Sequence, residues 1–158
     1  MEHLFDQNIR EFIRLCAKHD VRMILVGGGA VNFHGYQRHS ADVDFWIDLD
    51  STNLQHLKNV LLEMGFAPFD FPLEVEQALM NISIKISPVT DLELITRFSP
   101  GKTFTQAYED SVLAHFDGLP ALPYHVLSYD DLILSKVQAG RPKDLLDITE
   151  LKRLNQPF

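Results

Sequence analysis

Residues 26–47 read VGGGAVNFHGYQRHSADVDFWI, and this segment indicates the type of fold most clearly. It follows a short apolar run, residues 23–26 (MILV), that is typical of a buried strand. Three glycines then break the strand, and residues 30–34 can start a short helix. Residues 41–47 (ADVDFWI) alternate between polar and apolar side chains, which predicts a second strand with one buried face.

Asp42 and Asp44 are two residues apart on this second strand, so their side chains point the same way. Two carboxylates held so close repel each other unless a cation or water compensates for their charge. A hard divalent cation such as Mg²⁺, or Mn²⁺, prefers carboxylate oxygens and keeps positions open for phosphate. An isolated Asp-x-Asp pair also occurs on exposed edge strands, where it serves solubility. The pair therefore predicts a metal site only together with its neighbours in the sequence.

The glycines Gly27, Gly28 and Gly29 lie between the first strand and the short helix. Glycines there let backbone N–H groups approach a phosphate, and the start of a helix favours negative charge. The dinucleotide fingerprint Gly-x-Gly-x-x-Gly fails because its sixth position is Asn32, and no Gly-Lys-Ser/Thr follows to make a P-loop. A tight strand-to-helix turn is the alternative interpretation.

Residues 90–96 (TDLELIT) predict a further strand, with Asp91 and Glu93 on one face and leucines on the other. This strand could supply a third carboxylate to the site. An ordinary half-exposed strand is the alternative.

The whole chain has the composition of a globular protein, with 158 residues of which 46% are hydrophobic and 23% charged. The formal net charge of -8 argues against a broad nucleic-acid-binding surface. A few clustered cations, Arg38 and then Lys136, Arg141 and Lys143, suit a small anionic ligand such as a nucleotide. The single Cys16 cannot form an internal disulfide, so we expect a protein of the reducing cytoplasm. No apolar run is long enough to span a bilayer, so we expect no membrane partner.

The order of expected elements predicts an α/β (α+β) fold, a small mixed β-sheet flanked by helices with further helices at the C-terminus. Helices are expected over residues 6–18, 51–64, 104–113 and 129–139, and from 142 to about 154. Strands are expected over residues 81–87 and 90–96, and Asp117-Gly118 predicts a hairpin turn. We expect one domain, residues 1–158.

Together these features resemble the polymerase-beta-like nucleotidyltransferase superfamily. Its pattern is a strand, a glycine turn, Asp-x-Asp on a second strand and a later acid on a third. The chain looks especially like the minimal bacterial members, the AbiE-type toxin relatives and MNT-type antitoxins. The matching positions are Gly27, Gly28, Ala30, His34, Gly35, Arg38, Ser40, Asp42 and Asp44, and towards the C-terminus Lys136, Arg141, Lys143, Asp144 and Asp147.

The resemblance implies roles for particular residues. Asp42 and Asp44 would bind the catalytic metals, with Glu93 as the third acid and Asp91 as its competitor. The nucleotide would be held by Gly27, Gly28, Arg38, Ser40 and Lys136. Residues 1–100 would form the catalytic core, and residues 101–158 a C-terminal helical part.

The activity so implied is transfer of a nucleoside monophosphate from an NTP such as ATP to an RNA, protein or small-molecule acceptor. The protein could belong to a toxin–antitoxin system. The alternative is a catalytically weak or inactive relative that binds a protein partner. Glu93 favours this modestly, because relatives often carry Asp there, and residues 66–75 (FAPFDFPLEV) offer an apolar surface. In a third interpretation the Asp-x-Asp pair is structural, and the glycine turn and Arg38 beside it are coincidence.

Overall fold

The structure is a computed structural model that describes residues 7–39, 42–88, 90–98, 100–116, 119–120 and 122–156. The helices in these ranges are α1 Gln7–Lys18, α2 Gly27–Phe33, α3 Ser51–Glu63, α4 Leu73–Glu76, α5 Phe104–Asp110, α6 Tyr129–Ala139 and α7 Pro142–Leu154. The strands are β1 Met23–Val26, β2 Asp42–Ile47, β3 Ile82–Lys85, β4 Asp91–Ile95, β5 Val112–His115 and β6 Pro123–Val126. The predicted mixed α/β fold is confirmed.

The strands form one six-stranded sheet in the order β3-β4-β2-β1-β6-β5. The pairs β2–β4 and β1–β6 are parallel, and the other neighbours are antiparallel. In β1 all four side chains are buried, as the apolar run predicts for a strand covered on both faces. The strands β5 and β6, which come after residue 100, extend the same sheet that β1 to β4 begin.

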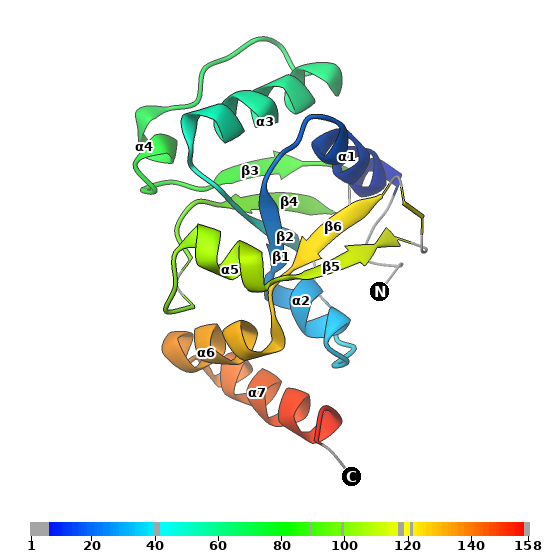
Figure 1. Cartoon of the computed structure of the whole chain (residues 1–158), viewed down its shortest axis with the longest axis vertical. Coiled ribbons are helices and arrows are strands. Elements are labelled where there is room, and N and C mark those ends of the chain that lie inside the picture. The colour runs from blue at the N-terminus through cyan, green and yellow to red at the C-terminus, as the bar shows by residue number, and fades with distance from the viewer. Residues whose placement is uncertain are drawn as a thin grey trace.

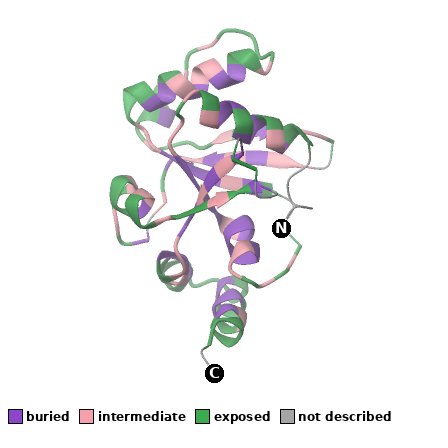
Figure 2. Ribbon diagram, turned by 45° about the vertical axis from the view of Figure 1, so that its right-hand side comes forward, coloured by how far each residue is buried: buried purple, intermediate pink, exposed green. Residues whose placement is uncertain are grey.

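Helices cover both faces of the sheet (Figure 1). On one face α1 packs its apolar side chains onto β2, where the rings of Phe12 and Phe45 lie 6.2 Å apart. On the other face α5 contacts Trp46, whose ring is 5.1 Å from that of Phe104. Buried residues gather on the strands and on the helix sides that face them (Figure 2). The core therefore lies on both faces of the central strands and holds β2 in place.

The C-terminal helices α6 and α7 pack together at the end of the molecule away from α1 and α3 (Figure 1). Two hydrogen bonds join the end of α2 to this region. His34 Nε2 lies 2.8 Å from the Leu127 carbonyl oxygen, and Asn155 Nδ2 donates to the His34 carbonyl oxygen at 2.9 Å. His34 is therefore a hydrogen-bonded packing residue.

Two expected boundaries are wrong. Helix α2 begins at Gly27 rather than at residue 30, because Gly27 turns the chain out of the strand with φ of 60° and Gly28 is already helical. The helix expected over residues 104–113 ends at Asp110, where Ser111 becomes extended and β5 pairs with β6. The hairpin turn predicted at residues 117–118 lies outside the described residues.

None of the helices in the described ranges combines the length and the apolar character needed to cross a membrane.

Candidate active site

Asp42 and Asp44 lie on the same face of β2, as the alternation predicts. Asp42 is exposed and Asp44 is half-buried, while Val43 and Phe45 on the opposite face are buried. The face with the two carboxylates is the one that carries Trp46, so it lies on the α5 side of the sheet.

The third acid comes from β4, which runs parallel to β2. In the register of this pair Glu93 is opposite Asp44, and Asp91 is opposite Asp42. The hydroxyl of Ser83 on the edge strand β3 donates a hydrogen bond to Glu93. Asp91 lies 3.7 Å from the ammonium of Lys85. Four carboxylates thus share one face, and Glu93 is the acid beside the more buried aspartate.

Gly27 closes the site from β1, whose last residue, Val26, pairs with Asp44. A Cβ atom built on Gly27 would lie 2.5 Å from Asp44 Oδ2, too close for any side chain. Its φ of 60° is also a conformation that other residues adopt only with strain. The glycine is needed here because the backbone of the turn and the carboxylate of Asp44 touch.

The pKa of Asp44 is raised from 3.8 to about 6. Burial is the largest cause, and the negative charges of Asp42 and Glu93 add to it. The ammonium groups of Lys143 and Lys136 oppose the shift. Asp44 therefore lies where negative charge accumulates and where a bound cation would be stabilised.

A cleft of about 390 Å³ opens beside these carboxylates. Its lining combines the acids, the glycine turn and a set of basic side chains, namely Gly27, Gly28, Arg38, His39, Asp42, Asp44, Lys136, Arg141 and Lys143. The basic side chains come from the loop after α2 and from α6 and α7. A cleft whose lining combines carboxylates with cations suits a metal-bound polyphosphate.

Two of the predicted nucleotide-binding cations are already paired. Arg38 donates from Nε and Nη2 to the two carboxylate oxygens of Asp147, at 2.9 and 3.0 Å. The ammonium of Lys136 is 3.2 Å from Asp144 and 3.0 Å from Asp147, and Lys136 is only 6% exposed. This network ties the loop after α2 to both C-terminal helices.

Lys143 belongs to the clustered cations that suit an anionic ligand, but the resemblance assigned no nucleotide contact to it or to Arg141. It is exposed, it lines the cleft, and within the described ranges no ion pair or hydrogen bond is recorded for its side chain. Its neighbour Arg141 pairs with Asp144 at 2.6 Å. The position of Lys143 directly after Pro142, at the start of α7, was the signal in the sequence. Ser40, which the resemblance placed at the nucleotide, lies outside the described residues.

Among the residues that the structure describes, no three His, Cys, Asp or Glu side chains are grouped closely enough to hold a metal ion by themselves. The carboxylate of Glu93 is turned to Ser83 and does not line the cleft. Asp42 and Asp44 are the acids that face the cleft together.

The model of a protein family described as "Nucleotidyltransferase of unknown function (DUF6036)" matches residues 3–156 of the chain. The protein belongs to this nucleotidyltransferase family. The match confirms the superfamily that the glycine turn and the Asp-x-Asp pair predicted. No protein with a curated description matches the sequence significantly.

The fold of this nucleotidyltransferase is also similar to that of a solved structure, the crystal structure of ANT(2″)-Ia in complex with adenylyl-2″-tobramycin. The TM-score is 0.53 and the sequence identity 13%, over 92% of this chain and 86% of the other. This likeness supports the fold.

Proposed function

We propose that this nucleotidyltransferase uses a divalent metal, held by Asp42 and Asp44, to transfer a nucleoside monophosphate from an NTP to an acceptor hydroxyl. The observation that carries the proposal is the position of Asp44. Its carboxylate touches the glycine turn, faces a cleft lined with cations and has a pKa raised to about 6 by burial and by two neighbouring acids.

The residues present fit a hard divalent cation such as Mg²⁺ or Mn²⁺. Asp42 and Asp44 offer carboxylate oxygens from one strand face, and the raised pKa of Asp44 reflects negative charge that a cation would neutralise. A bound metal ion would supply charge neutralisation at the phosphates. Glu93 would join as a third ligand or act on the acceptor.

In the proposed reaction the acceptor oxygen attacks the α-phosphorus of the NTP. A new oxygen–phosphorus bond forms, and the bond from the α-phosphorus to the bridging oxygen breaks. Pyrophosphate leaves with that electron pair, and the hydroxyl proton goes to a carboxylate, for which we propose Glu93 opposite Asp44. This role requires the Glu93 carboxylate to turn from Ser83 into the cleft. The N–H groups of the turn at Gly27 and Gly28, with Lys143, would bind the triphosphate. Arg38 and Lys136 would hold α6 and α7 in position around it.

Calorimetric titration of ATP, CTP, GTP and UTP, with and without Mg²⁺, tests the donor. We expect metal-dependent binding of at least one nucleotide, lost in the matched variant Asp42→Asn/Asp44→Asn. If the folded protein binds no nucleotide, the proposal is wrong. Transfer of label from an α-phosphorus-labelled NTP to RNA, to protein or to a small molecule then identifies the acceptor, since the γ-phosphate leaves with pyrophosphate.

A second candidate function is binding of a protein partner, as in the toxin–antitoxin role that the AbiE-type and MNT-type resemblance implies. The supporting observation is an apolar groove of about 380 Å³ lined by Phe66, Phe69, Phe71 and Met80. Phe66 is 44% and Met80 43% exposed, which is unusual for large apolar side chains at one place. Co-expression with the product of an adjacent gene, followed by size-exclusion chromatography, should give a complex that Phe66→Ser/Met80→Ser loses. Two separate peaks would reject this function.

A further inference from the structure

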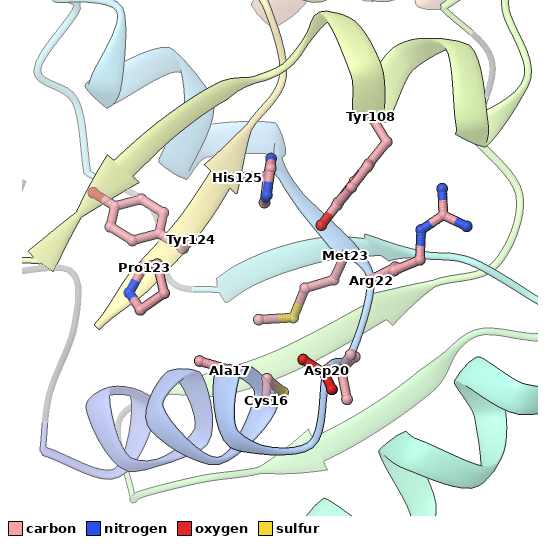
Figure 3. A pocket seen from close by; sticks show the side chains of 10 residues that line it. Cys16, Ala17, Asp20, Arg22, Met23, Tyr108, Pro123, Tyr124 and His125 are labelled. Atoms are coloured by element: carbon pink, nitrogen blue, oxygen red, sulfur yellow. The ribbon is translucent and has the colours of Figure 1, made fainter. Parts of the chain in front are cut away.

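A second cleft, of about 380 Å³, lies at the other end of β1 from the candidate active site (Figure 3). Met23 at the start of β1 pairs with Ile47, whereas Val26 at its end pairs with Asp44. Three residues of strand, on the order of 10 Å, separate the two places. We call it the α1–α5 cleft and define it by Cys16, Asp20, Met23, Tyr108, Tyr124 and His125.

One side of the α1–α5 cleft is aromatic. The rings of Tyr108 and His125 lie 4.2 Å apart, and His125 Nδ1 is 2.8 Å from the hydroxyl of Ser111. Burial lowers the pKa of His125, so its ring is neutral at pH 7. Burial raises the pKa of Tyr124, so its hydroxyl keeps its proton. Apart from Arg22 and Asp20, the cleft is therefore lined by uncharged groups.

The positive charge of Arg22 is already engaged. Its Nη1 atom is 2.8 Å from Asp48 Oδ2. The guanidinium also lies over two aromatic rings, 4.9 Å from that of Tyr108 and 5.6 Å from that of Phe104. Figure 3 shows the end of this side chain turned towards α5, away from Cys16 and Ala17. An anion entering the cleft would have to compete with Asp48.

The carboxylate of Asp20 is the charge left at the cleft. In the described part of the chain no hydrogen bond or ion pair is recorded for this carboxylate. Its negative charge contributes to the raised pKa of Tyr108, which places it near that hydroxyl. Figure 3 shows the Asp20 carboxylate and the Tyr108 hydroxyl bordering the same space, above the end of α1.

The turn at Asp20, which is exposed, does not use the side chain of this residue. Asp20 ends α1 with φ of 56°, in the left-handed region that favours glycine. The turn is closed by backbone alone, since the Val21 N–H donates to the Cys16 carbonyl oxygen at 2.9 Å. Glycine would make this turn with less strain, so the turn itself does not require a carboxylate.

We propose that the α1–α5 cleft binds a small organic cation, an ammonium group on an apolar body. The ammonium would lie between the Asp20 carboxylate and the Tyr108 hydroxyl and donate hydrogen bonds to both, since the ring of Tyr108 is already covered by Arg22 and His125. The apolar body would pack on Met23 and the buried end of α1 at Cys16. The cleft volume is within the range of sites for small molecules. This site is distinct from the nucleotide cleft and does not depend on the proposed reaction.

Nuclear magnetic resonance titration of the nitrogen-15-labelled full chain tests the proposal. The probe is 2-phenylethylammonium, its neutral match is 2-phenylethanol, and its anionic match is 3-phenylpropionate. We expect the cation to shift amide signals of residues 16–23, 108, 124 and 125. Both matches should bind at least about tenfold more weakly. Equal binding of the alcohol or the anion, or shifts centred on Gly27 and Asp42, would overturn the proposal.

Two substitutions of Asp20 distinguish the effect of removing its charge from an effect on folding. Asp20→Asn tolerates the left-handed backbone and removes the charge, and Asp20→Gly relieves the strain and should raise the melting temperature. Both variants should bind 2-phenylethylammonium about tenfold or more weakly than the wild type. Wild-type affinity in either variant would contradict the proposal. The Asp42→Asn/Asp44→Asn variant should bind the probe as the wild type does, so failure of the proposed nucleotidyl transfer is seen separately.

Discussion

Asp44 lies beside Asp42 and Glu93, and burial together with these two charges raises its pKa to about 6. In metal-free protein the folded state therefore holds a proton that the unfolded chain releases near pH 4. Between these pH values the folded state binds more protons than the unfolded state, so stability falls as pH rises from about 4 to about 6.

Asp44→Asn should remove this penalty. In the presence of EDTA at pH 7 we expect the variant to be more stable than the wild type by about 1–2 kcal/mol, after allowing for screening by solvent. The gain should be much smaller near pH 4, where the wild-type carboxyl is protonated in the folded state and partly protonated in the unfolded chain, in which its pKa is 3.8. Chemical denaturation at both pH values measures it, and an equal gain at pH 4 and pH 7 would contradict the assigned cause.

Gly27 and Gly140 allow a matched comparison, because their φ angles are 60° and 62°. A Cβ on Gly140 would meet only the Val137 carbonyl oxygen at 3.6 Å, whereas a Cβ on Gly27 would lie 2.5 Å from Asp44 Oδ2. We expect Gly140→Ala to cost about 1 kcal/mol of stability and Gly27→Ala about 2–3 kcal/mol. Gly27→Ala alone should also lose nucleotide binding. Equal losses of stability would show that the contact with Asp44 is unimportant.

At the scale of elements, α6 and α7 meet the loop after α2 through one buried network. Arg38 pairs with Asp147, and Lys136 lies between Asp144 and Asp147, which are 0% and 1% exposed. Removing one member of the network leaves a buried charge without its full set of partners. This lowers the free energy of unfolding more than the loss of an ion pair at the surface does. The network therefore holds α6 and α7 in position, and α7 carries Lys143.

The variants Lys136→Gln and Lys143→Gln should distinguish a residue needed for stability, Lys136, from one needed for nucleotide binding, Lys143. We expect Lys136→Gln to lower stability by about 2–3 kcal/mol, because Asp144 and Asp147 lose their shared buried partner. Lys143→Gln should change stability by less than about 0.5 kcal/mol and weaken NTP binding about tenfold. Urea denaturation and nucleotide titration of both variants measure this. A reversed pattern would assign the phosphate contact to Lys136, as the resemblance implies.

At the scale of the whole molecule, the sheet does not stop at residue 100. Strand β6 pairs with β1 in parallel and β5 pairs with β6, so residues after 100 cover one edge of the strand that leads to Gly27. A catalytic core of residues 1–100 and a C-terminal part of residues 101–158 remain our proposal for how the roles are divided.

A chain that ends at residue 100 should not fold on its own. It would expose the edge of β1 where β6 pairs and would lose the buried side chains of β6 and α6, among them Val126 and Leu132. We expect circular dichroism to show no cooperative thermal transition, in contrast to the full chain. Cooperative unfolding of the truncated chain would show that residues 1–100 are an independent unit.

The sequence alone determined the features that depend on neighbouring residues. The alternation of residues 41–47 predicted which face of β2 carries Asp42 and Asp44, because side chains alternate along any strand. The expected helix over residues 129–139 matches α6, because Ser128 caps its start and Gly140 ends it, and such signals act within one helical turn. The glycine turn and the Asp pair together indicated the superfamily.

Which distant residues meet depends on how the elements pack in three dimensions. The parallel register placed Glu93 rather than Asp91 opposite Asp44, and register depends on packing of the whole sheet. Arg38 faces Asp147 across 109 positions of the chain, so the sequence could suggest a nucleotide-binding arginine but not its partner. Likewise Ser111 ends α5 early because β6 offers a strand to pair with. Such contacts arise when elements far apart in the chain pack together, and local sequence patterns do not encode them.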